Sequence, residues 1–181
     1  MDGRRGVIKS KEGRCMRPHF NLQLSKGLKS EARVIEIISD AGFKITHRGA
    51  NHRHDVCVVA PSGLVFRVEV KNEDAYADSG NILVELRQGS PPKPSGLSSS
   101  ESTICVHTLG DAAALYRSQE MRIYLSGSLI AKDVSYCNLG VFGKSDNNNR
   151  GVKVRRGMLD GWPWYDELPL EDVAKSKLWR F

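Results

Sequence analysis

The chain has 181 residues, 40% of them hydrophobic, which is enough for one domain with a substantial core. Lysines and arginines (27) outnumber aspartates and glutamates (21), so the net charge is +6 at pH 7. This balance suits a polyanionic partner such as nucleic acid, although ordinary solubility would also account for it. The sequence contains neither an apolar run of roughly 18 residues, as a membrane span requires, nor the apolar stretch of a signal peptide. We therefore expect a cytoplasmic protein.

The cysteines argue against a disulfide framework or a zinc knuckle, because no two of them form a Cys-x-x-Cys pair. The four are Cys15, Cys57, Cys105 and Cys137. His52, His54 and Cys57 could form a zinc cluster, but no matching second pair of ligands is present.

In chain order, we expect a flexible basic arm over residues 1–20, an α/β core over 21–135, and a basic hairpin with an aromatic tail over 136–181, packed on the core. Apolar residues at helical spacing predict a helix from Ser30 to Ala41, with Gly42 as its C-cap. The next elements are inferred from alternation, turn residues and a capping box. They are strands at 43–46, 54–59, 65–71, 81–88, 103–109 and 121–125, a helical turn at 98–101, helices at 111–118 and 170–179, and an exposed turn at 144–151 before a strand at 152–156.

The most informative segment is the predicted hairpin formed by strands 54–59 and 65–71. Side chains alternate along a strand, so Glu69 and Lys71 project from the same face, and Asp55 can join them across the hairpin. Two carboxylates beside an ammonium suit Mg²⁺-dependent phosphodiester hydrolysis: the acids hold the hard cation, and the lysine orients or helps to deprotonate the attacking water.

This arrangement resembles the PD-(D/E)xK nuclease superfamily, with His54 where the family usually has proline before Asp55, and with Glu69-Val70-Lys71 as the second half of the motif. The segment from Lys26 to Lys71 is similar to the amino-terminal half of archaeal Holliday-junction resolvases. The runs at 80–85 and 93–100, and the strand ending at Val106-His107, look similar to phage-encoded nucleases of the same superfamily.

The resemblance implies a restriction-endonuclease-like core, in which helices flank a central mixed β-sheet. It also implies a DNA endonuclease that uses Mg²⁺ or Mn²⁺, held by Asp55, Glu69 and the Val70 carbonyl, with Lys71 positioning the water. By the same resemblance Glu31 would be a helical acid facing the metal, although a first-turn acid placed against the helix dipole is an equal alternative. Glu85 is an additional candidate acid, or a surface charge.

Three groups of residues are candidates for binding DNA, mainly through its phosphates. They are Arg48, Asn51, His52 and Arg53 before the first motif strand; Lys93, Ser95 and Ser98 in the Pro-rich loop and after it; and Lys153, Arg155 and Arg156 on the basic arm.

Several functions share these residues. The first is a structure-specific, junction-resolving endonuclease encoded by a phage or mobile element, acting as a homodimer in a bacterial or phage-infected cell. A homing or restriction nuclease fits equally. The pattern is also compatible with a non-catalytic DNA-binding module, or with an unrelated α/β protein that matches the motif by chance. No glycine-rich nucleotide loop is visible, so no nucleotide cofactor is expected.

Overall fold

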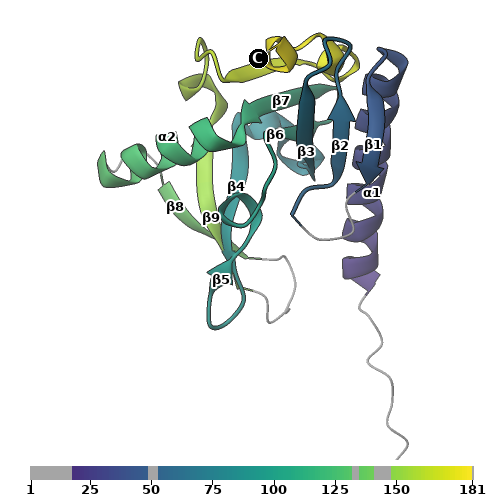
Figure 1. Cartoon of the computed structure of the whole chain (residues 1–181). Helices are drawn as coiled ribbons and strands as arrows, with labels where there is room; N and C mark the ends of the chain where they lie inside the picture. The colour runs from purple at the N-terminus through teal and green to yellow at the C-terminus, as the bar shows by residue number, and fades with distance from the viewer. Residues whose placement is uncertain (1–17, 49–52, 132–134, 141–147, 181) are drawn as a thin grey trace, which may run out of the picture.

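The computed structural model describes residues 18–48, 53–131, 135–140 and 148–180. These residues form two α-helices, several short 3₁₀ helices and two β-sheets (Figure 1). The helices are α1 (Pro18–Asp40) and α2 (Ser118–Ala131). The six-stranded sheet has the order β1 (Lys44–Arg48), β2 (Val56–Val59), β3 (Val65–Asn72), β6 (Ile104–Leu109), β7 (Ala112–Arg117) and β10 (Tyr165–Pro169). The four-stranded sheet has the order β5 (Lys93–Pro94), β4 (Asn81–Gln88), β9 (Asn148–Arg155) and β8 (Ser135–Gly140).

The six-stranded sheet is mixed, because β3 and β6 run parallel while its other neighbouring strands are antiparallel. Its two central strands are β3 and β6, and β3 forms a hairpin with β2 in which Val56 lies opposite Val68 and Val59 opposite Val65. The predicted α/β class, with a central mixed sheet flanked by helices, is confirmed. The C-terminal segment contributes strands to both sheets: β10 is an edge strand of the six-stranded sheet, and β9 pairs with β4 in the four-stranded sheet.

One face of the six-stranded sheet is covered by α1 and by the end of the chain (Figure 1). Val34, Ile35 and Ile38 recur at helical spacing on α1 and are buried against the sheet. Trp179 packs edge-on against Phe66, with ring centroids 5.3 Å apart. Because Val70 belongs to this core, its strand neighbours Glu69 and Lys71 face the opposite side.

The opposite face is covered by α2 and the four-stranded sheet, which meet over a second apolar core. The buried side chains that these two elements contribute are Ile82, Val84, Met121, Leu125, Val152 and Val154. The Glu69 and Lys71 side chains therefore lie where the two sheets approach each other.

Two adjacent predictions were wrong in type: residues 112–117 form strand β7 where a helix was expected, and 118–131 form helix α2 where a strand at 121–125 was expected. Gly110, with φ of +71°, reverses the chain so that β7 pairs with β6 in the sheet. Met121 and Leu125 are both buried while Ile123 between them is 63% exposed, a pattern of helical period.

Several predicted elements also differ from the structure in their bounds or type, and strand β9 begins at Asn148, inside the exposed turn expected at 144–151. Helix α1 begins at Pro18, twelve residues before the expected Ser30 and inside the predicted arm, whose residues 1–17 lie outside the described part. The C-terminal helix is two 3₁₀ helices, Leu170–Lys175 and Lys177–Arg180, because Ser176 between them is not helical (φ −53°, ψ 137°). The turn expected at 98–101 is a 3₁₀ helix at Gly96–Ser98. Here a Cβ on Gly96 would lie 2.5 Å from the Glu85 carbonyl oxygen, so glycine lets this loop pack against β4.

Candidate active site

Asp55 lies directly before β2 and is held against the edge of β3. Its carboxylate accepts a hydrogen bond from the Val70 amide at 2.7 Å, and its own amide donates to the Val68 carbonyl at 2.9 Å. In a strand the N–H and C=O of one residue point to the same edge, so the Val70 carbonyl lies on the side of β3 that Asp55 occupies. Asp55 and Glu69 are therefore neighbours in space, as the predicted hairpin requires.

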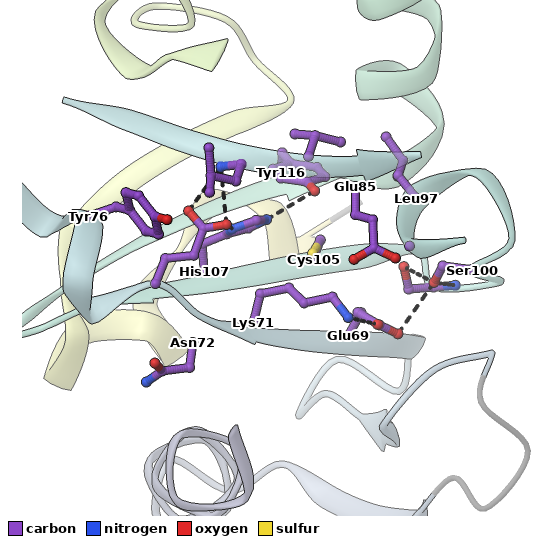
Figure 2. Close-up of a pocket in the computed structure, with 15 residues that line it drawn as sticks. Glu69, Lys71, Asn72, Tyr76, Glu85, Leu97, Ser100, Cys105, His107 and Tyr116 are labelled. Carbon is purple, nitrogen blue, oxygen red and sulfur yellow. Dashed lines mark hydrogen bonds and ion pairs between the residues drawn. The ribbon is translucent and has the colours of Figure 1, made fainter. Parts of the chain in front are cut away.

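Glu69 and Lys71 project from β3 toward the space between the sheets (Figure 2). The Lys71 ammonium lies 2.5 Å from a Glu69 carboxylate oxygen. The Glu69 side chain is 11% exposed and that of Lys71 42% exposed, so the carboxylate is largely buried while the lysine is accessible to solvent. Both residues line a cavity of about 200 Å³, whose other walls come from β4, β6, β7 and the loop at 96–102.

The electrostatics of these residues are those of crowded carboxylates. Burial, and then the charge of Glu69, raise the pKa of Asp55 to about 6. The charge of Glu31 on α1 adds to this shift, which places Glu31 within electrostatic reach of Asp55. Burial alone would lower the pKa of Lys71, but the charge of Glu69 and the hydrogen bond to it raise that pKa above its ordinary value. Lys71 is therefore a firmly protonated ammonium.

These donors suit a hard divalent cation. Among the described residues, no three His, Cys, Asp or Glu side chains converge closely enough to hold a metal ion by themselves. Mg²⁺, however, usually binds one or two carboxylates and keeps several waters. Asp55, Glu69 and the Val70 carbonyl provide such a set. Burial and the charge of Glu69 both disfavour the ionised form of Asp55, and a bound cation would oppose both effects.

Glu85 lines the same cavity as Glu69 and Lys71, from the facing strand β4 (Figure 2). Its carboxylate accepts a hydrogen bond from the Ser95 hydroxyl, which ties the Pro-rich loop to β4. Glu85 thus lines the same cavity as the proposed catalytic residues, and the Ser95 hydroxyl, a candidate for binding DNA, forms a hydrogen bond within the protein instead.

The candidate DNA-binding residues fall into different environments. Exposed side chains, available to a ligand, are those of Arg48, Lys93, Ser98, Lys153 and Arg155. Asn51 and His52 lie outside the described residues. Arg53 is exposed but forms an ion pair with Glu101.

Arg156 differs from the other two basic residues of its arm, because its side chain is only 13% exposed. Its guanidinium pairs with Glu167 and donates to the Ala77 carbonyl at 2.7 Å. These contacts join β9 to β10 and to the segment before β4, so the charge of Arg156 is used inside the fold.

Sequence reasoning missed a buried network of polar side chains, formed by Glu73, His107 and Tyr116, that also lines the cavity. The Glu73 carboxylate lies 2.9 Å from His107 Nδ1 and accepts hydrogen bonds from the Leu83 amide, and His107 Nε2 lies 3.1 Å from the Tyr116 hydroxyl. Burial would lower the pKa of His107, but the Glu73 charge raises it to about 10. The parallel pairing of β3 with β6 places Lys71 beside His107. This pairing is not visible in the sequence, and it brings the polar network into the same cavity as Glu69 and Lys71.

Of the residues considered for a zinc cluster, His54 and Cys57 are in contact, with 3.2 Å between His54 Nε2 and Cys57 Sγ. That is a pair of side chains and not a zinc site, and His52 lies outside the described residues. Within the described part of the chain, no helix has the length and apolar character needed to cross a membrane.

No protein-family model matches the chain, and a search of curated proteins found no match. Among solved structures the chain is similar to a bacterial homing endonuclease, I-Ssp6803I, with 16% sequence identity and a TM-score of 0.41. The similarity covers 54% of this chain and 70% of that chain. A likeness this distant does not place the chain in a family, so its function has to be argued from the residues of the site.

Proposed function

We propose that this protein is a metal-dependent DNA endonuclease that hydrolyses phosphodiester bonds with an activated water. The observation that carries the proposal is the assembly of Asp55, Glu69 and Lys71 at one end of the β2–β3 hairpin, with the pKa of Asp55 raised to about 6. A carboxylate whose pKa is raised by burial and by a neighbouring charge is typical of catalytic sites.

Each residue has a definite task in this proposal. Asp55, Glu69 and the Val70 carbonyl would hold Mg²⁺ or Mn²⁺, which supplies Lewis-acid chemistry at the phosphate and lowers the pKa of water. Lys71, firmly protonated, would donate hydrogen bonds to the attacking water or to the phosphate and offset the charge that develops there. Its raised pKa disfavours the other role considered for it, that of a general base. Glu31 and Glu85 would add negative charge on either side of this centre.

Two of the substrate contacts proposed for DNA, Lys153 and Arg155, lie on the four-stranded sheet beside the site. Lys153 and Arg155 are exposed on β9 and lie opposite Leu83 and Asn81 of β4, hence on the same face as them. Leu83, like Glu85 farther along β4, lines the cavity that contains Glu69. A phosphate backbone that follows this face would thus lead from Arg155 and Lys153 toward the carboxylates.

The form of DNA that is cut separates the specific versions of the proposal. A junction-resolving enzyme and a homing or restriction enzyme use the same residues, and each would cut both strands most simply as a homodimer. Purified protein incubated with Mg²⁺ or Mn²⁺ and a panel of four-way junction, linear duplex, supercoiled plasmid and single-stranded DNA would identify the substrate. Junction-selective cutting supports the first version, and cutting of linear duplex at fixed positions supports the second.

A matched pair of lysine variants tests the catalytic assignment. Lys71→Ala should abolish cleavage while DNA binding persists, whereas Lys175→Ala, which removes an exposed lysine from the C-terminal 3₁₀ helix, should cut like the wild type. Full activity of Lys71→Ala would refute the assignment.

The second candidate is a non-catalytic DNA-binding module. The close Lys71–Glu69 ion pair favours it, because the lysine already neutralises one carboxylate of the site. DNA binding without cutting on every substrate, in the presence of either metal, would establish this second function.

A further inference from the structure

We propose that Ser100 and Arg122 are positioning residues that hold the Asp55 and Glu69 carboxylates at the separation needed to bind a divalent cation; this inference rests on the function proposed above. Neither residue touches the substrate in this proposal. Both act through the segment 100–103, which joins the two carboxylate-bearing strands.

Ser100 lies beside the Glu69 carboxylate (Figure 2) and contacts the backbone of the segment that leads into Asp55. Its hydroxyl lies 3.4 Å from a Glu69 carboxylate oxygen and 3.0 Å from the carbonyl oxygen of Arg53, two residues before Asp55. The Ser102 amide donates to the same hydroxyl at 3.1 Å, which fixes its position. The single proton of this hydroxyl is donated to one acceptor at a time, and the Arg53 carbonyl, Glu69 and the Ser102 hydroxyl at 2.9 Å all lie in reach, so one side chain contacts both the segment entering β2 and the acid on β3.

The neighbouring residues repeat this link through the backbone. The Glu101 amide donates to the Arg53 carbonyl at 2.7 Å, and the Glu101 side chain pairs with Arg53 and, at 3.6 Å, with Arg67. The Thr103 amide donates to the Arg67 carbonyl at 2.7 Å, and the Arg67 amide donates to the Thr103 hydroxyl at 3.0 Å. The segment therefore fastens to β3 and to the entry of β2 at once.

Arg122 holds the segment from the other side. From the first turns of α2, its guanidinium donates to the Ser100 carbonyl at 2.5 Å and to the Leu97 carbonyl at 3.0 Å. The planar, two-pronged guanidinium fixes both carbonyls together, which the single ammonium of lysine does not reproduce. Ser102 adds a buried contact to the same helix, since its hydroxyl lies 2.8 Å from that of Ser118.

Groups that orient metal ligands from behind commonly change metal affinity by about 10- to 100-fold when they are removed. We expect Ser100→Ala and Arg122→Lys to raise the dissociation constant for Mn²⁺, measured by calorimetry, by about tenfold or more. Ser100→Thr, which keeps the hydroxyl, should bind Mn²⁺ like the wild type. Ser62→Ala, in the exposed turn at the other end of the hairpin, and Arg180→Lys are the matched controls.

A second readout needs no metal and no activity. If the segment sets the approach of the two acids, then in metal-free protein the Val70 amide, which donates to the Asp55 carboxylate at 2.7 Å, should exchange its hydrogen with solvent faster in Ser100→Ala and in Arg122→Lys and at the wild-type rate in the controls. Unchanged Mn²⁺ affinity and unchanged exchange of the Val70 amide in both folded variants would overturn the inference.

The two readouts separate this inference from the proposed function. A wild-type protein that binds no Mn²⁺ defeats the proposed function, while the exchange rate of the Val70 amide still decides whether the segment positions the acids. A wild type that binds Mn²⁺ and cuts DNA, together with variants that match it in both readouts, defeats the positioning role alone.

Discussion

Replacing Asp55 by asparagine should make the metal-free protein more stable at neutral pH while removing its activity. The asparagine oxygen can still accept the hydrogen bond from the Val70 amide, so the substitution removes the charge and keeps the shape. In the wild type, burial and the charge of Glu69 oppose ionisation of Asp55 in the folded state. The ionised acid is thus a local cost to folding that a bound cation would offset.

The size and pH range of the effect follow from the pKa values. The pKa of Asp55 is about 6 in the folded protein against 3.8 ordinarily, so the folded state retains this proton more strongly than the unfolded state does. Wild-type stability contributed by Asp55 is therefore fully present below pH 3.8 and is lost as the pH rises through 6. At about 1.4 kcal/mol per pKa unit the full shift corresponds to about 3 kcal/mol, and because Asp55 is partly exposed to screening solvent we expect about 1–2 kcal/mol.

Urea unfolding in EDTA, at pH values on both sides of this range, measures the difference directly. Asp55→Asn should be more stable than the wild type by about 1–2 kcal/mol at pH 8 and equal to it near pH 3.5. Addition of Mn²⁺ should stabilise the wild type and not the variant. An asparagine variant that is no more stable than the wild type at pH 8 would show that the carboxylates are not crowded as described.

Other expectations follow from the same structure. Glu73→Gln should lower the free energy of unfolding by about 1–3 kcal/mol at pH 7, measured in urea, because His107 loses the charge that keeps it protonated and the buried polar groups around it are left imperfectly paired; no loss of stability would contradict the buried ion pair. Affinity for Mn²⁺ should rise as the pH increases to about 6 and then level off as Asp55 becomes ionised, so calorimetry showing a flat profile from pH 5 to 8 would count against Asp55 as a ligand. Lys153→Ala and Arg155→Ala should each weaken DNA binding and reduce its salt dependence by about one counterion, and titrations at several salt concentrations showing an unchanged slope would remove that residue from the interface.

Local patterns predicted the β2–β3 hairpin because each of its strands alternates and the turn between them is marked by Pro61 and Gly63. The same reasoning failed at Ala112–Arg117, where three consecutive alanines favour a helix in isolation. Pairing with β6 on one side and β10 on the other makes this segment a central strand, and small side chains fit where both faces are covered. Such partners are distant in sequence, so no local pattern contains them.

The candidate site likewise contains residues that local patterns could group and residues that only distant packing brings together. Asp55, Glu69 and Lys71 could be grouped from the sequence because one hairpin carries all three. Ser100 and Arg122 reach them only through the packing of α2 and the loop at 96–102 beside β3. Arg156 was grouped with the exposed basic residues Lys153 and Arg155 from the sequence. In the structure it forms an ion pair with Glu167 of a later strand, which no local pattern contains.

The most direct test of the proposed nuclease centre is cleavage of a DNA substrate by the wild type and by Asp55→Asn, with Mg²⁺ or Mn²⁺ and with EDTA, alongside a binding assay on the same DNA. We predict cutting by the wild type with metal alone, no cutting in EDTA, and no cutting by Asp55→Asn although it binds the DNA. Cutting by Asp55→Asn at the wild-type rate, or by the wild type in EDTA, would contradict the claim that these carboxylates form a metal-dependent nuclease centre.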